Sequence, residues 1–491
     1  MATSFKQRPL YGNETNWPSQ NIYEGVMPVG QPIIFTLANS SVVSNNYNVK
    51  FVAEVSVRRS GKISDADLTA GTYNIGTFKT TPNDKGNGIF DFRSILESYV
   101  SSDNQGSSQT ITGGSYSKFK GVNYSSDTPH PIHVIDRFCQ TRNGTKWIKI
   151  RFYIEGSTTA TGAVIEIANT ELNSINMLIT DGVLQHNDYI KREAGNYGYD
   201  MGYYGKNFYP NFNSKFITNA PTTLYANKED YGTLAFYQYP NGSYYVNYIT
   251  FNWYDSSGSL LGTKQLNVNW TNGSGSSSSD NAATKINYFG AYPGNLRNWV
   301  TAFESDIDDI SYYTIQANNT SAGSPGKMYT VYINCPDLRG YESVRLCWLN
   351  QWGVWDYYTF TKKSVKSSTT NRTTYTQSTG TWNESTFDIY GYKGGRKNFR
   401  VNSTERFQIN TDFITEKEGR MFQDLIASPE VYKLNGFDSS DTAPHDTITG
   451  RYVEPVLMTT SNYIEKTIAN DKLIQYTFEL ERNKTQRTQT V

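Results

Sequence analysis

Residues 345–360 read RLCWLNQWGVWDYYTF and hold three tryptophans, two tyrosines and a phenylalanine. Side chains of different character alternate on either side of Asn350–Gly353, which has the residues of a tight turn. The pattern predicts a β-hairpin with aromatic side chains on both of its faces. Such a hairpin belongs in a core, or in a contact between domains or subunits. A surface that stacks sugars or bases would instead need several rings aligned on one exposed face.

The composition of the whole chain is also typical of β-structure. The length of 491 residues favours about three domains. Aromatic residues make up 14% of the chain and charged residues only 18%, which suits sheets with large buried or interfacial surfaces. Lys and Arg together number 45, as do Asp and Glu, so the formal net charge is zero. A nucleic-acid-binding protein that neutralises phosphates would be more basic, and we expect no nucleic-acid partner.

Three cysteines in a chain of this length are not a disulfide framework, and we expect Cys139, Cys335 and Cys347 to be reduced and buried. The N-terminal residues contain no apolar stretch of signal-peptide length. No apolar run approaches the ~20 residues of a membrane helix. These features predict synthesis in a cytoplasm and no membrane contact.

The distribution of alternating segments and polar loops predicts a mainly β, multi-domain chain of β-sandwiches with one or two short helices. We expect a first β domain at 1–205 with a polar N-terminal arm. It is followed by a central β-sandwich at 206–342. The last part is a C-terminal β domain at 343–491 with a polar tail. A Tyr-rich connection at 199–223 leads into the strands of the central domain, and a long Gly/Ser loop spans 271–285.

Local patterns predict individual strands. Residues 32–57 hold an apolar run, a polar turn and an alternating run, and indicate a hairpin-like pair. Residues 146–156 and 248–254 alternate as further strands, and Asp255–Gly258 supplies a turn after the second of them. A Thr/Ser-rich stretch at 364–395 is compatible with exposed strands or with irregular chain.

Two helices are expected. Residues 88–100 carry apolar residues at helical spacing over one short segment. The stronger signal is at 415–428, where Thr415 and Glu418 form a capping box and Pro429 ends the helix. Its apolar stripe consists of Met421, Phe422, Leu425 and Ile426.

Motifs for catalysis or metal binding are sparse. Only four histidines occur, and His130-Pro-Ile-His133 has a proline where a helix would be needed to align the pair. Asp306, Asp308 and Asp309 form the densest acidic cluster but lack the glycine and final glutamate of a calcium loop, so a solvated turn is the favoured interpretation. Paired glycosidase carboxylates leave no local signature and stay open. We expect no cofactor.

Three segments of the C-terminal half resemble virion structural proteins of tailed bacteriophages, including those of cyanophage-like contractile-tailed phages. They are LCWLNQWGVWDYYTF, then INTDFITEKEGRMFQDLIASPEVY, then PVLMTTSNYIEKTIANDKLIQYTFELERN. Upstream, FITNAPTTLYANKEDYGTLAFYQ and YDSSGSLLG extend the likeness to roughly residues 210–485. The resemblance implies a virion component and carries no catalytic residues.

The expected function is therefore that of a structural homo-oligomer in a phage tail, baseplate or neck, made in the host cytoplasm and acting without catalysis. Its partners would be copies of itself and other virion proteins. The alternative is a receptor- or carbohydrate-binding fibre module that contacts host glycans, with or without glycoside hydrolase activity. An extracellular adhesin is disfavoured because no signal sequence is seen. The candidate interface residues are Trp348, Trp352, Trp355, Tyr357, Tyr203, Tyr204 and Phe208.

Overall fold

The structure is a computed structural model, and it confirms a mainly β chain, with five β-sheets and a few short helices among the described residues. Those residues are 3–7, 22–58, 72–102, 138–140, 144–185, 215–237, 246–268, 286–318, 325–334, 340–435, 453–462, 474–483 and 486–487.

The chain divides into two compact units. Unit 1 comprises residues 1–334, 349–357 and 436–449, and unit 2 comprises residues 335–348, 358–435 and 450–491. The expected boundaries at 205 and 342 stay predictions. Among the described residues, no helix has the length and apolar character needed to cross a membrane.

The first part of unit 1 contains two sheets. One has the strand order β1 (Ser4–Gln7), β3 (Ile34–Ala38), β6 (Asn87–Asp91). The other has the order β2 (Ile22–Pro28), β10 (Leu172–Thr180), β8 (Thr145–Ser157), β4 (Tyr47–Arg58), β5 (Thr72–Thr80), with β9 (Ile165–Glu166) beside β8. Phenylalanine rings from both sheets pack together, and Phe35 and Phe152 lie 5.2 Å apart between centroids. A shared apolar core joins the two sheets.

The hairpin-like pair expected over residues 32–57 is wrong. β3 pairs with β1 and β6, whereas β4 pairs with β5 and β8, so the two strands belong to different sheets. The polar residues between them form α1 (Ser40–Asn45), because the Asn39 side chain accepts a hydrogen bond from the Val42 backbone N–H. Asn and Ser are favoured both at helix N-caps and in turns, and here Asn39 is the N-cap of a helix.

The expected strand at 146–156 is confirmed as part of β8. The short helix expected at 88–100 is confirmed only in its second half, as α2 (Arg93–Leu96) and the 3₁₀ turn η2 (Glu97–Tyr99). Residues 87–91 before it form strand β6 instead. The N-terminal residues Ser4–Gln7, placed in the expected polar arm, form β1.

The second part of unit 1 also contains two sheets. The larger has the order β11 (Thr223–Ala226), β17 (Tyr329–Ile333), β16 (Tyr312–Asn318), β13 (Tyr248–Tyr254), β14 (Leu260–Asn267). The smaller has the order β12 (Thr233–Tyr237), β15 (Ile286–Gly290), β7 (Phe138–Gln140). Helices α6 (Pro293–Trp299) and α7 (Thr301–Asp306) follow β15. The predicted strand and turn at 248–258 are confirmed, and Gly258 takes φ 83° in that turn.

The larger of these two sheets is buried on one face. Phe251 and Trp253 of β13 lie in the core with Tyr313 and Ile315 of β16. Trp253 packs edge-on against Phe303 of α7 at 5.5 Å and donates its indole N–H to Asp306 at 2.8 Å. The other face of the sheet, which we call the open face, carries the alternate residues of each strand.

Unit 2 is built on one sheet. Its strand order is β19 (Trp355–Phe360), β18 (Val344–Leu349), β22 (Val431–Leu434), β23 (Val453–Met458), β24 (Thr477–Arg482), β21 (Gly395–Asn410), β20 (Val365–Gln377), with β25 (Gln486–Arg487) beside β21. Helix α8 (Glu416–Ala427) confirms the predicted capped helix. The Glu418 carboxylate accepts hydrogen bonds from the Thr415 backbone N–H at 2.6 Å and from its hydroxyl at 2.9 Å. Phe422 of this helix is fully buried against Trp348, Tyr358 and Phe478.

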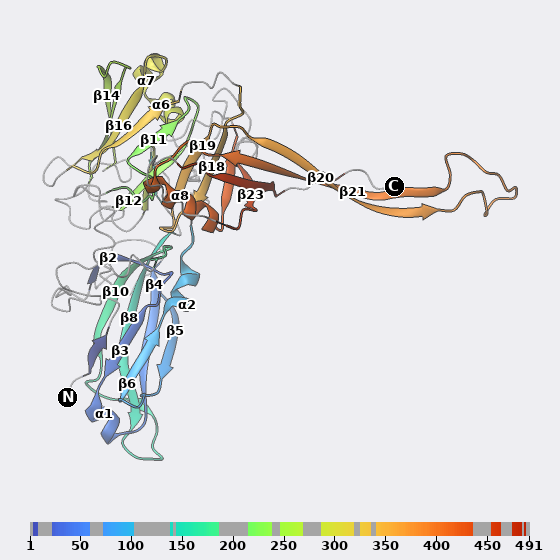
Figure 1. The fold of residues 1–491 in the computed structure, drawn as a ribbon. Coiled ribbons are helices and arrows are strands. Elements are labelled where there is room, and N and C mark those ends of the chain that lie inside the picture. Colours follow the sequence, from blue (N-terminus) through green and yellow to red (C-terminus); the bar gives the residue numbers. More distant parts are fainter. Residues whose placement is uncertain are drawn as a thin grey trace. The chain divides into compact units, whose positions relative to one another are not determined.

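The Thr/Ser-rich stretch at 364–395 forms strand β20 and the loop after it, and β20 pairs with β21 in a long two-stranded ribbon, labelled in Figure 1. β21 contacts β24 at residues 406–410 and β25 at residues 402–403, and no further pairing is described beyond these. Residues 372–377 and 395–401 therefore form a two-stranded ribbon, and we call residues 372–401 the arm and the loop 378–394 its tip. From Asn402, the paired strands carry the arm's tip roughly 20 Å outward at about 3.4 Å per residue.

Candidate interaction surfaces

The aromatic hairpin is part of the chain's own core. Trp348, Trp352, Trp355 and Tyr357 are exposed by no more than 6%. Within unit 1, the Trp352 indole N–H donates to Asn219 at 3.1 Å, and the Tyr357 hydroxyl lies 3.1 Å from that of Thr233. This confirms the interpretation of the hairpin as core. As placed, these four side chains offer almost no surface to a second subunit.

The remaining interface candidates, Tyr203, Tyr204 and Phe208, lie outside the described residues. The Gly/Ser loop at 271–285 and all four histidines also lie outside them. Of the cysteines, the side chain of Cys347 is described, and it is free and buried as expected.

The hairpin encloses a buried carboxyl group. Asp356 is 2% exposed and accepts a hydrogen bond from the Thr218 hydroxyl at 2.5 Å. Burial raises the pKa of Asp356 from 3.8 to about 6, and the hydrogen bonds from Thr218 and Asn350 oppose that rise. Its other oxygen, Oδ2, has no hydrogen-bond partner among the described residues. A raised pKa is common in catalytic acids, but this group lies in packed core rather than at an exposed surface.

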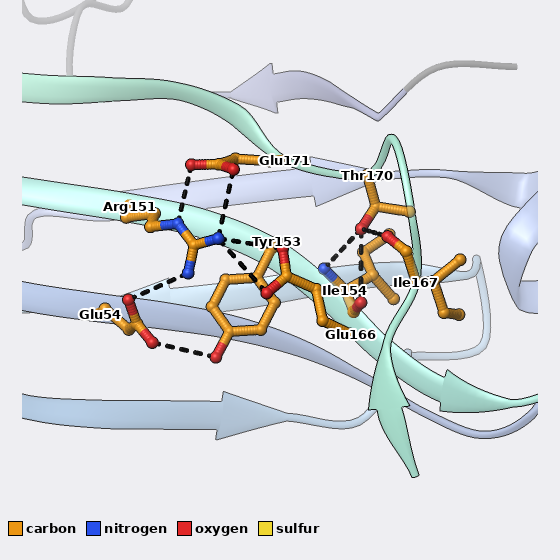
Figure 2. A network of polar contacts seen from close by, with 8 residues as sticks. All are labelled: Glu54, Arg151, Tyr153, Ile154, Glu166, Ile167, Thr170 and Glu171. Atoms are coloured by element: carbon orange, nitrogen blue, oxygen red, sulfur yellow. Dashed lines mark hydrogen bonds and ion pairs between the residues drawn. The ribbon is translucent and has the colours of Figure 1, made fainter.

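A second polar cluster lies on the first part of unit 1. Figure 2 shows the Arg151 guanidinium of β8 between three carboxylates. It contacts Glu171 at 2.7 Å, Glu166 at 3.0 Å and Glu54 at 3.2 Å. The ring of Tyr153 lies under the guanidinium at 4.6 Å, and its hydroxyl donates to Glu54 at 3.1 Å. The cluster ties together β4, β8, β9 and the residue before β10.

The pKa shifts in this cluster fit a structural role rather than a role in acid catalysis. The hydrogen bond from Arg151 lowers the pKa of Glu171, so that carboxylate stays ionised. Burial, followed by the hydrogen bond to Glu54, raises the pKa of Tyr153 to about 12, so its hydroxyl keeps its proton. A glycosidase pair needs one carboxyl group with a raised pKa, and Arg151 acts in the opposite direction.

The acidic cluster at the end of α7 and in the turn that follows it consists of partnered residues. Asp306 accepts from Trp253, and Asp308 pairs with Lys228 at 2.6 Å. The backbone N–H of Asp309 donates to the Asp306 carbonyl at 2.8 Å. Across the described residues, no group of three or more His, Cys, Asp or Glu side chains is placed to hold a metal ion. The solvated-turn interpretation accounts for the three aspartates.

The open face of the β11–β14 sheet carries aligned tyrosines that the sequence analysis did not single out. Tyr225, Tyr332, Tyr312 and Tyr254 are register partners on four adjacent strands, and we call them the tyrosine row. Ring centroids along the row are 5.7, 5.5 and 4.9 Å apart, with interplanar angles of 26°, 39° and 13°. Tyr225 is 52% exposed and Tyr332 39%. The visible signal was the alternation of Tyr248, Thr250, Asn252 and Tyr254, but strand register is set by tertiary structure.

The arm carries the most exposed aromatic residues described. Trp382 is 75% and Tyr392 72% exposed, while Phe387, Tyr390 and Phe399 are between 39% and 51% exposed. Two pairs of these rings contact each other. Trp382 meets Phe387 at 4.9 Å, and Tyr390 stacks on Tyr392 at 5.6 Å.

The backbone of the tip is held by its own hydrogen bonds. The Thr381 hydroxyl donates to the Thr386 carbonyl at 2.7 Å and accepts from the Asp388 N–H at 2.8 Å. The Trp382 indole N–H donates to the Thr379 carbonyl at 2.7 Å. The tip therefore presents its aromatic rings from a folded loop.

Comparisons with known proteins add little. No family model matches the chain, and no curated protein matches it either. Two solved structures of Escherichia coli alpha-2-macroglobulin are similar at 8% and 7% identity, with TM-scores of 0.17 and 0.14. They cover 82% and 79% of this chain, which spans only 21% and 29% of theirs. Similarity at these TM-scores supports no argument about fold or function.

Proposed function

We propose that this protein is a structural subunit of a tailed-bacteriophage particle, in the tail, baseplate or neck, and that it acts by oligomerisation and docking without catalysis. It would be made in the host cytoplasm and work in the virion. The resemblance of residues 210–485 to virion proteins supports this assignment to a particle. The observation that carries the assembly role is the bare arm of unit 2.

An exposed ribbon of this kind is a poor structure for an isolated protein. Residues 365–374 of β20 are all exposed, and a two-stranded hairpin alone is at best marginally stable in water. The arm also exposes Trp382 and Tyr392, residue types enriched in protein interfaces. Another protein surface that covers the arm would bury its apolar side chains and would pair the free backbone groups of its open strand edge.

The positive charge of the arm indicates which kind of protein surface can bind it. Residues 372–401 contain five Lys or Arg residues and two Asp or Glu residues. Two such arms would repel each other, whereas the rest of this neutral chain carries a net charge of minus three. The arm's partner is therefore a non-arm surface of another copy or of a neighbouring virion protein.

Light scattering of the purified chain tests the proposal. In one variant, residues 378–394 are replaced by Asn-Gly, which joins the paired residues Gln377 and Gly395 through a two-residue hairpin turn. A second variant keeps the loop but carries Trp382→Ser and Tyr392→Ser. A matched control carries Tyr225→Ser and Tyr332→Ser, exposed tyrosines of unit 1.

We expect the parent to form a discrete oligomer, or to join one when phage-particle proteins are added. Both arm variants should shift toward monomer at the same concentration, with unchanged circular dichroism, and the control should assemble normally. A monomeric parent that ignores particle proteins would contradict the proposal. Assembly unaffected by the loss of the arm tip would contradict the role given to the arm.

A further inference from the structure

The open face of the β11–β14 sheet has an unusual composition. Sixteen strand positions point to it by register and alternation, and fifteen of them are Tyr, Thr, Asn or Gln. None is charged, although 18% of the chain is. These positions are Thr223, Tyr225, Tyr248, Thr250, Asn252, Tyr254, Leu260, Thr263, Gln265, Asn267, Tyr312, Thr314, Gln316, Asn318, Thr330 and Tyr332.

Hydrogen bonds within the face fix the orientation of its polar groups. The Asn318 amide donates to the Thr250 hydroxyl at 2.9 Å, and the Thr263 hydroxyl donates to Asn252 at 2.8 Å. The Gln316 amide donates to the Gly326 carbonyl at 2.9 Å. Rigid strands therefore hold these hydroxyl and amide groups beside the tyrosine row, which lowers the ordering cost of binding a ligand.

The tyrosine row gives the face an aromatic border. At one end of the row, the rings of Tyr254 and Tyr312 are stacked, with a centroid distance of 4.9 Å and an interplanar angle of 13°. At the other end, Tyr225 belongs to β11, the last strand of this sheet among the described residues, and it is half exposed. The exposed surface of the Tyr225 and Tyr332 rings is where an apolar ligand surface can stack, beside the Thr, Asn and Gln side chains of the face.

We propose that the open face binds a neutral oligosaccharide. A sugar offers an apolar ring face for stacking and many uncharged hydroxyl groups for hydrogen bonding, which matches an aromatic border beside Thr, Asn and Gln side chains. Nucleic acids and acidic polymers need cationic partners, and none of the sixteen positions supplies one. This inference depends only on unit 1 and is independent of the arm.

The face is built for binding rather than for cleavage. It contains no carboxylate, and the carboxylate that follows it in the turn, Asp255, already accepts hydrogen bonds from Ser257 and Ser259. These bonds lower the pKa of Asp255 and keep it ionised, which is unsuited to a general acid. A bound glycan should therefore be recovered intact.

The test measures binding of the full chain to immobilised cellohexaose, maltohexaose, an N-acetylglucosamine hexamer and neutral bacterial O-polysaccharides, beside anionic glycans such as polysialic acid and alginate. We expect at least one neutral glycan to bind with an affinity that is unchanged between low and high salt. Tyr225→Ala should weaken it about tenfold or more, as loss of one stacked ring does elsewhere. Tyr225→Phe, which keeps the ring, should weaken it less.

Two further variants keep the test decisive. Thr330→Arg places a charge in the middle of the face without removing a tyrosine, and it should also abolish binding. Tyr392→Ala removes an even more exposed stacked tyrosine from the arm and should leave binding unchanged. The proposal is overturned if no neutral glycan binds, if only anionic glycans bind in a salt-dependent manner, or if folded Tyr225→Ala and Thr330→Arg proteins bind like the parent.

Discussion

Asp356 and Thr218 are 138 positions apart in the chain, yet the Thr218 hydroxyl donates to the Asp356 carboxyl group at 2.5 Å inside unit 1. The aspartate is almost completely buried, and its second oxygen has no hydrogen-bond partner among the described residues. Burial disfavours the ionised form, so folding is opposed whenever this group is charged. The pair therefore makes the stability of unit 1 depend on pH.

The change Asp356→Asn should remove that dependence. Because the folded-state pKa of Asp356 is raised from 3.8 to about 6, its contribution to stability falls as pH rises between those values. Relative to the parent, the variant should gain roughly 3 kcal/mol of unfolding free energy between pH 4 and pH 8. Denaturant unfolding at both pH values, followed by circular dichroism, measures this difference.

Asp308→Asn is the matched control for that experiment. Asp308 is exposed, and its hydrogen bond with Lys228 lowers its pKa, so this group stabilises the fold at neutral pH and loses that effect as pH falls. The control should therefore change stability in the opposite sense. Equal pH profiles for the parent and Asp356→Asn would show that Asp356 is not buried as described.

Local signals in the sequence were sufficient for several elements. The capping box at Thr415 and Glu418 located helix α8, because such a cap needs only four consecutive residues. The alternation around Asn350–Gly353 predicted the β18–β19 hairpin, and Gly353 takes φ 77° in its turn. In these places, short-range chemistry and the final fold agree.

Other features depend on pairings between distant segments. The segment at 32–57 was taken for a hairpin because its two strands alternate, but their partners come from elsewhere in the chain. The tyrosine row joins Tyr225, Tyr254, Tyr312 and Tyr332, which become neighbours only through sheet register. Composition cannot supply that register, which is why the sequence pointed to the buried tryptophans instead.

Substitution of Trp355 should damage folding, whereas substitution of Trp382 should not. Trp355 is 2% exposed, so Trp355→Ala leaves a cavity and should cost about 3–5 kcal/mol. Trp382 is 75% exposed at the arm tip, and Trp382→Ala should change stability by less than about 0.5 kcal/mol. Thermal unfolding of both variants under dilute conditions distinguishes them, and similar losses would argue against the core assignment.

Removal of Arg151 should destabilise unit 1 in a pH-dependent way. Arg151→Gln leaves Glu54, Glu166 and Glu171 without their shared cation, and these side chains are partly exposed. The expected loss is roughly 1 kcal/mol at pH 7.

The sign of this effect follows from the lowered pKa of Glu171, whose ordinary value is 4.5. Stability from the Arg151 contacts is present above that value and is lost as pH falls through the folded-state pKa. The deficit of Arg151→Gln should therefore shrink as pH falls below 4.5. Arg151→Lys keeps the positive charge but loses the planar guanidinium group. Its stability should therefore lie between those of the parent and Arg151→Gln. A deficit of equal size at pH 3 and pH 7 would point to lost packing instead.

Two glycines with similar backbone angles should respond differently to alanine. Gly353 and Gly340 have φ values of 77° and 69°, so alanine is strained at both, at a cost of about 1–2 kcal/mol. At Gly353, however, a Cβ atom would lie 1.7 Å from the Asp181 carbonyl oxygen, whereas nothing lies within 4 Å of one at Gly340. Gly353→Ala must therefore displace backbone within unit 1 and should cost clearly more than Gly340→Ala. Equal shifts in the denaturation midpoint would mean that the hairpin turn does not approach Asp181 in solution.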